Sequence, residues 1–171
     1  MESKSFLPQV VINSTEVLTQ FNSGQLLVID GDRQGGIIIC KRHHAEFAGP
    51  GAAIGGIFDI ECCRVIPIGD LNLVYPETYE HRQQAYAIRQ QWIRLTQEVT
   101  NNPVPLERGV EILTLLEEHF DHESVSYIPD ECLAMLVGVL PKTIKMARKA
   151  IPNKLEKSKI ATFHKETVEQ K

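Results

Sequence analysis

The sequence contains no apolar run that approaches the roughly 20 residues of a membrane-spanning helix. Its first 20 residues lack the apolar core of a signal peptide, so we expect a cytoplasmic protein with no membrane partner. It also lacks the phosphate-loop pattern G-x-x-x-x-G-K-S/T, a nucleophile elbow and the C-x-x-C pairs of zinc sites. These absences exclude the common catalytic and metal-binding motifs, and we expect a protein that is not an enzyme and needs no cofactor or metal.

The four cysteines, at positions 40, 62, 63 and 132, have no metal-binding spacing. Cys62 and Cys63 are adjacent, so they would point to opposite faces of a strand. We interpret all four as small buried hydrophobic residues in a reducing compartment.

Positive charge is scarce over most of the chain and concentrated at its end. Residues 141–171 contain nine Lys or Arg against three Asp or Glu, although the formal net charge of the whole chain is −4. Residues 1–140 contain nine Lys or Arg against nineteen Asp or Glu. This asymmetry is typical of a protein with a local acidic partner such as nucleic acid; a solvated lysine-rich tail is the alternative.

Residues 10–76 have the pattern of short β-strands. β-Branched runs such as QLLVID and GGIIICK alternate with glycine and proline, which mark turns. The pattern predicts a small antiparallel β-roll, a sensor-like domain over residues 1–76. Because the later segments are helical in pattern, the expected fold class is α+β.

Residues 77–100 contain no glycine or proline and are rich in Gln, Arg, Ala and Glu, which predicts one long helix. Its apolar residues alternate in steps of three and four, as in a coiled coil. The predicted dimer seam consists of Ala85, Ile88, Trp92, Leu95 and Val99. We expect a homodimer through residues 77–100; a helix packed on its own sheet is the alternative.

The two prolines of NNPVP, residues 101–105, end this helix and mark a domain boundary. The third domain, over residues 101–171, would open with the amphipathic helix LERGVEILTLLEEHF. The next unit, DECLAMLVGVLPKTIKMARKA, predicts a helix-turn-helix. Ala134 lies where a larger side chain would separate the two helices, and Gly138 lies where the turn needs a positive φ.

The second helix of this unit carries the candidate DNA-binding residues. They are Lys142, Thr143, Lys145, Met146, Arg148 and Lys149. Lys142 and Lys145 lie near the helix N-terminus, within reach of base edges or phosphates, whereas Arg148 is better placed for the DNA backbone. The outward stripe has no planar Arg, Asn or Gln for two-pronged base recognition, which argues against high sequence specificity.

This order of segments resembles the Crp/Fnr family of bacterial transcription regulators. GPGAAIGGIFDIECCRVIPIGDLNLVYP is similar to the end of the family's β-roll, and ERGVEILTLLEEHF to the helix that opens its DNA-binding domain. IPDECLAMLVGVLPKTIKMARKAI is similar to its helix-turn-helix. The resemblance covers roughly residues 20–151 and implies a homodimeric regulator of double-stranded DNA with a shortened sensor domain.

The sequence departs from the family pattern at two places. Gly55-Gly56 lacks the acid that accompanies a glycine in the cyclic-nucleotide site, and only Arg64 could correspond to the site's arginine, so we expect no cyclic nucleotide. Leu140 replaces a polar start of the recognition helix, and Met146 stands where arginine is frequent. The final residues also lack the glycine turn of a wing hairpin.

Two other functions are open. A protein–protein adaptor would keep this fold without DNA binding and use Leu140, Met146 and the acidic roll to contact a partner. An enzyme would need the polar residues that lie close together in the first third of the sequence, which are Asp30, Asp32, His43, His44 and Glu46. We interpret these as turn and loop residues, because no catalytic motif accompanies them.

Overall fold

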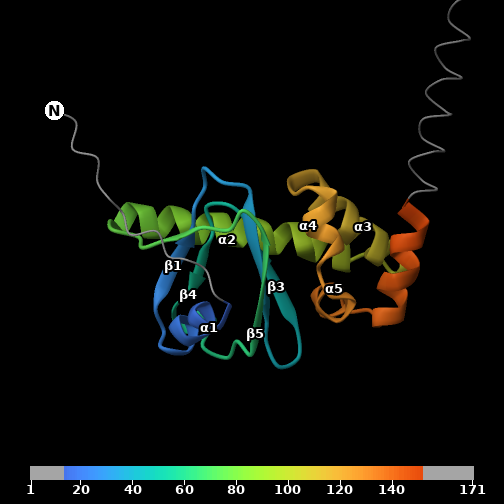
Figure 1. Cartoon of the computed structure of the whole chain (residues 1–171), viewed down its shortest axis with the longest axis horizontal. Helices are drawn as coiled ribbons and strands as arrows, with labels where there is room; N and C mark the ends of the chain where they lie inside the picture. The colour runs from blue at the N-terminus through green and yellow to red at the C-terminus, as the bar shows by residue number, and fades with distance from the viewer. Residues whose placement is uncertain (1–13, 152–171) are drawn as a thin grey trace, which may run out of the picture.

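In the computed structural model, which describes residues 14–151, short strands and one long helix precede a group of shorter helices (Figure 1). The strands are β1 (Leu26–Ile29), β2 (Gly35–Cys40), β3 (Ala45–Ala48), β4 (Ala53–Gly55), β5 (Arg64–Gly69) and β6 (Leu73–Val74). The helices are α1 (Ser14–Asn22), α2 (Tyr79–Thr100), α3 (Pro105–His119), α4 (His122–Ser126), α5 (Asp130–Val137), the 3-10 turn η1 (Gly56–Phe58) and a helix over residues 141–151. The expected α+β class is confirmed.

The strands form two antiparallel three-stranded sheets, in the orders β4-β1-β6 and β3-β2-β5. Every residue of the central strand β2 is buried. Because side chains alternate across a strand, Ile37 and Ile39 belong to the hydrophobic cluster that includes α1. Ile38 and Cys40 belong to the cluster that includes α3 and α5. Strand β2 therefore lies between two cores.

Residues 14–22 form α1, so the expectation of strands throughout residues 10–76 is wrong for this segment. Val17 and Phe21, one helical turn apart, are both fully buried in the cluster with β1 and β2. The β-branched threonines and valine of this short segment favour strand in isolation, and burial of one helical face overrides that preference.

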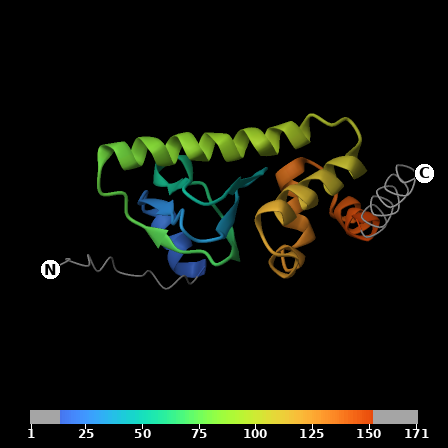
Figure 2. The same cartoon turned by 90° about the horizontal axis from the view of Figure 1, so that it is seen from above.

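Helix α2 runs along one side of the molecule, past both the strands and the later helices (Figure 2). It begins after Thr78, whose hydroxyl accepts a hydrogen bond of 3.1 Å from the backbone N–H of His81. It ends at Thr100, and Pro105 opens α3. The helix and the proline break agree with the expected ranges to within two residues.

One hydrophobic cluster joins the β-rich part to the later helices. The ring of Phe47 in β3 contacts Trp92 of α2 and Phe120 at the end of α3, with ring centroids 5.2 and 5.8 Å apart. Leu133 and Val137 of α5 are fully buried in the same cluster. The strands and the helical unit therefore share a core. Residues 152–171, which are expected to lack a normal wing hairpin, lie outside the described residues.

Candidate functional site

The helix over residues 141–151 presents a row of basic side chains to solvent. It follows α5 through a turn in which Gly138 has φ 64° and ψ 46°, a left-handed conformation that glycine adopts without strain. Ala134 of α5 is buried. The exposed side chains of the helix include Lys142, Lys145, Met146 and Lys149, whereas Ile144 and Ala147 are fully buried and Thr143 is half-buried.

Helix α3 fixes the orientation of this helix through a close approach at Gly109. A Cβ added at Gly109 would lie 3.0 Å from the Cβ of Ala147 and 3.6 Å from Cδ1 of Ile144. Only a residue without a side chain allows the two helices to approach this closely. Sequence reasoning did not single out Gly109, although a glycine inside an otherwise regular helix is the signal for such an approach.

Arg148 differs from the outward lysines because it is bonded within the chain, and its predicted contact with DNA stays a prediction. Its Nε donates to Asp130 Oδ1 at 2.8 Å, and one of its terminal nitrogens donates to the carbonyl of Ile128 at 2.7 Å. The side chain is half-buried. Arg148 therefore ties the lysine-bearing helix to the start of α5.

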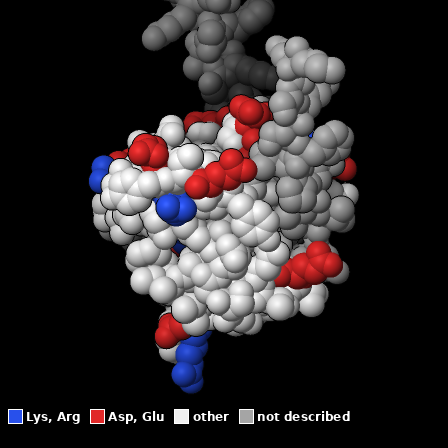
Figure 3. All heavy atoms as spheres, turned by 90° about the vertical axis from the view of Figure 1, so that its left-hand side faces the viewer, with Lys and Arg blue, Asp and Glu red and all other residues white. Residues whose placement is uncertain are grey.

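The lysine-bearing helix contains no Asp or Glu among residues 141–151. Asp130, the acid in contact with it, is paired with Arg148. Figure 3 shows the opposite end of the molecule, where the visible charged side chains are more often acidic than basic. Lys142, Lys145 and Lys149 are thus gathered at one end of the molecule.

The predicted dimer seam of α2 is covered by the chain's own loops. The indole of Trp92 lies against Gly49, where a Cβ would come within 2.5 Å of the ring. Ile88 lies against Gly51, where a Cβ would come within 2.9 Å of Cδ1. The glycines between β3 and β4 therefore let α2 approach the backbone.

The rest of the predicted seam also faces this chain. Ala85 is 1% exposed and packs with Val28 and Ala53 of the first sheet. Val99 belongs to the core of the later helices. Leu95 lines a groove between α2 and α3. The packing on its own sheet and helices, which the sequence left open, is the one observed.

A different stripe of α2 remains accessible, which we name the Tyr79 stripe. It consists of Tyr79, Gln83, Tyr86, Gln90, Ile93, Gln97 and Thr100. These residues alternate in steps of four and three, so they lie on one face of the helix. All seven are exposed or half-buried. Sequence reasoning missed this stripe because its glutamines hide the repeat from a search for apolar residues.

A buried ion network connects α2 to the β-rich part. Arg89 donates to Asp59 Oδ2 at 3.2 Å and also pairs with Glu46. Lys41 Nζ lies 3.0 Å from Glu46 Oε1 and 3.4 Å from Asp59 Oδ1. Asp59, fully buried, accepts a further hydrogen bond of 2.8 Å from the N–H of Gly55. The two positive charges of the network are thus matched by two negative charges.

The network sets the ionisation of Glu46. Burial opposes loss of the proton, but hydrogen bonds and charge from Arg89 and Lys41 outweigh it and lower the pKa of Glu46 from 4.5 to about 2. Arg64, the residue expected to correspond to a phosphate-binding arginine, is exposed at the start of β5. The arginine that enters the β-rich part is Arg89, and carboxylates already neutralise it.

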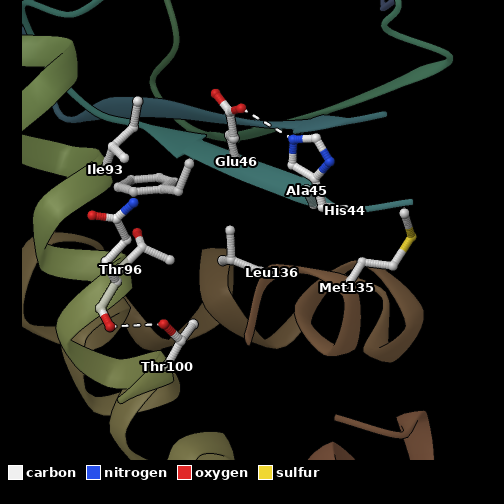
Figure 4. Close-up of a pocket in the computed structure, with 10 residues that line it drawn as sticks. His44, Ala45, Glu46, Ile93, Thr96, Thr100, Met135 and Leu136 are labelled. Carbon is white, nitrogen blue, oxygen red and sulfur yellow. Dashed lines mark hydrogen bonds and ion pairs between the residues drawn. The ribbon is translucent and has the colours of Figure 1, made fainter. Parts of the chain in front are cut away.

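A cavity of about 320 Å³ lies between β3, α2 and α5 (Figure 4). Phe47, Ile93 and Leu136 form apolar parts of its wall, and Thr96 and Thr100 contribute hydroxyl groups from α2. Ile93 also belongs to the Tyr79 stripe, so the cavity opens beside that face of α2.

Comparison with protein-family models gives no match, and comparison with curated proteins gives none. Within residues 14–151, no group of three or more His, Cys, Asp or Glu side chains is arranged to hold a metal ion. None of the helices in this part of the chain has the length and apolar character to cross a membrane. Function must therefore be inferred from the geometry of the chain.

Proposed function

We propose that this protein is a homodimeric transcription regulator, similar to the Crp/Fnr family, that binds double-stranded DNA through the helix over residues 141–151. The observation that carries the proposal is the orientation of this helix. Lys142, Lys145 and Lys149 are exposed on one face, while Ile144 and Ala147 are fully buried. Helix α5 and the lysine-bearing helix then act as a helix-turn-helix, with the lysines turned toward DNA.

The lysines act mainly on phosphates. An ammonium group is a compact positive charge with three donors, which suits a phosphate and lacks the planar fork that recognises a guanine edge. Each bound phosphate releases counterions, so binding weakens as salt rises. Met146, 51% exposed beside the lysines, offers an apolar surface to a thymine methyl group.

The Tyr79 stripe is the dimer face in this proposal. Tyr79, Tyr86 and Ile93 recur every seven residues, and three glutamines recur at the intervening positions of the seam. Such a repeat is self-complementary when two copies of a helix pair in parallel about a two-fold axis. The ring of Phe58, 60% exposed, contacts Tyr86 with centroids 5.7 Å apart and widens the apolar edge of this face.

The buried ion network supports the absence of a cyclic nucleotide. A nucleotide phosphate needs an uncompensated cation, and Arg89 is already held by Asp59 and Glu46. Displacing either carboxylate would leave a buried charge without a partner. The sensor-like part therefore serves to hold α2 in place.

The test is a matched pair of triple variants. In the first, Lys142, Lys145 and Lys149 are changed to Ala; in the second, the exposed Arg42, Arg64 and Arg94 are changed to Ala, which removes the same charge elsewhere. Fluorescence anisotropy with random-sequence duplex at about 50 mM salt measures binding. The lysine variant is expected to lose binding and the arginine variant to keep it. Equal losses in both variants would overturn the assignment.

A protein–protein adaptor is the second candidate, favoured by one observation. Leu140 is 72% exposed and Met146 is 51% exposed, so the face that carries the lysines also carries apolar surface. For this function, wild-type protein would fail to bind duplex at low salt and would retain a protein partner. Changing Leu140 to Ser would then release that partner without affecting the fold.

A further inference from the structure

Two cysteines from distant parts of the chain meet in the core between the strands and α5. Cys40 is the last residue of β2, Cys132 lies in the first turn of α5, and their Sγ atoms are 3.6 Å apart. The two residues are 92 positions apart in sequence and only 3% and 2% exposed. Their contact therefore joins the β-rich part to the helical unit.

The other two cysteines have different surroundings, and the expectation that all four are buried is wrong for Cys63, which is exposed. The thiol of Cys62 donates to the carbonyl of Arg64 at 3.3 Å, and the thiol of exposed Cys63 donates to the carbonyl of Cys40 at 3.2 Å. Both thiols thus point to backbone oxygen atoms. Among the cysteines within residues 14–151, Cys40 and Cys132 are the pair whose sulfur atoms contact each other.

A covalent bond between the two sulfurs requires a small movement. A disulfide has a sulfur–sulfur distance of about 2.05 Å, so the two atoms must approach by roughly 1.5 Å. Strand β2 is hydrogen-bonded on both sides, to β3 and β5, and resists displacement. Helix α5 has only two turns and is bordered by the Gly138 turn, so we expect α5 to be the element that moves.

We propose that Cys40 and Cys132 form a modification site at which a peroxide converts the two thiols into a disulfide that links β2 to α5. This site is a property of the chain itself and does not rest on DNA binding.

The reaction uses one peroxide molecule for two thiols. The sulfur of Cys132 attacks the O–O bond of hydrogen peroxide, which gives a sulfenic acid and one water. The sulfur of Cys40 then displaces the hydroxyl group from that sulfenic acid, and the thiol proton leaves with it as a second water. Both sulfurs are oxidised and the peroxide is reduced.

The surroundings of Cys40 slow the second step. Burial, followed by the neighbouring Cys132 sulfur, raises the pKa of Cys40 to about 12. Because the thiolate is the attacking form, only a small fraction of Cys40 reacts at any moment near neutral pH, and the 3.6 Å contact between the two sulfurs is what favours this pair. Access of the peroxide requires a local opening of α5, which limits the rate.

The test uses the reduced full-length protein, treated with hydrogen peroxide and then with iodoacetamide to block the remaining thiols. Trypsin places the cysteines in three separate peptides, because Cys40 lies in residues 34–41, Cys62 and Cys63 in residues 43–64, and Cys132 in residues 109–142. The expected product is a cross-linked pair of residues 34–41 with 109–142, with Cys62 and Cys63 both alkylated. The disulfide is also expected to raise the urea concentration at the midpoint of unfolding, and dithiothreitol should reverse this shift.

Two variants and one condition complete the experiment. Cys132→Ala is expected to abolish the cross-linked peptide, and Cys63→Ser is expected to leave it unchanged. The same oxidation in concentrated urea gives mixed pairs, which shows that the native selectivity comes from the fold. Oxidation of wild-type protein that reaches Cys63 and leaves Cys40 and Cys132 alkylated would overturn the proposal, as would the same mixture of pairs with and without urea.

Discussion

The indole of Trp92 in α2 lies so close to Gly49 that a Cβ on the glycine would come within 2.5 Å of the ring atoms Cε2 and Cζ2. The ring of Trp92 also meets Phe47 edge-on, with centroids 5.2 Å apart. Trp92 therefore joins α2 to the β-rich part from the side that the sequence had offered as a dimer seam. The Tyr79 stripe lies on a part of α2 that remains accessible.

Changing Gly49 to Ala is expected to destabilise the fold by about 1–3 kcal/mol, because the new methyl group must displace the half-buried indole of Trp92. Urea unfolding, followed by tryptophan fluorescence, measures the loss. Gly31→Ala is the control, since a Cβ there would meet its nearest atoms at 3.8 Å. A Gly49→Ala protein as stable as the control would show that Trp92 is not held as described.

Changing Ile93 to Glu is expected to convert the homodimer into a monomer, because it places two like charges in the middle of the paired Tyr79 stripes. Sedimentation velocity measures the mass. Gln91→Glu adds the same charge on an exposed position of α2 outside the stripe and is expected to remain dimeric. A wild-type monomer would overturn the homodimer, and a dimer that survives Ile93→Glu would place the interface elsewhere.

Arg148 and Lys149 are neighbours with different expected roles. Arg148→Ala removes the hydrogen bonds to Asp130 and to the Ile128 carbonyl, and we expect it to lower the free energy of unfolding by about 1–2 kcal/mol. Lys149→Ala is expected to change the free energy of unfolding by less than about 0.5 kcal/mol and to weaken duplex binding. Urea titration and anisotropy on both variants separate the two roles. Lower stability in Lys149→Ala together with weaker duplex binding in Arg148→Ala would contradict these roles.

Stability is expected to fall in acid as the buried ion network loses charge. Arg89 and Lys41 hold the pKa of Glu46 at about 2, below its ordinary 4.5, so the ionised carboxylate stabilises the fold above pH 4.5. This contribution, at most about 3 kcal/mol, is lost as the pH falls from 4.5 toward 2. Urea midpoints over this range measure it.

Glu46→Gln is the matching variant for the acid experiment. It is expected to be less stable at neutral pH, because Arg89 loses a charged partner, and to show a smaller decline in acid. Glu80→Gln, at an exposed position of α2, should keep the wild-type decline. If Glu46→Gln and wild-type protein decline in parallel, the network does not govern acid stability.

The sequence predicted the elements whose limits depend on glycine and proline. Helix α2 ends where the prolines begin, and Gly138 provides the left-handed residue between two short helices. It also predicted which face of the last helix carries lysines, since Ile144 and Ala147 lie one turn apart. Local rules of this kind need no knowledge of tertiary neighbours.

The sequence did not determine what covers an apolar face. The spacing of Ala85, Ile88, Trp92, Leu95 and Val99 fits a coiled coil and a helix on a sheet equally well, and Gly49 and Gly51 decide for the sheet. The partners of Arg148 within the chain were missed for a similar reason. One of its acceptors is the backbone carbonyl of Ile128, 20 residues earlier, and no side-chain pattern reveals such a partner.

The central claim is that the lysine face of residues 141–151 binds DNA, and the salt dependence of duplex affinity tests it most directly. Anisotropy titrations of wild-type protein between about 50 and 200 mM salt are expected to give a linear fall of log affinity with log salt. Removing Lys142, Lys145 and Lys149 should reduce that slope by about 0.9 for each phosphate that the variant no longer neutralises. Wild-type affinity that does not change with salt, or a slope that is unchanged without the lysines, would contradict the account.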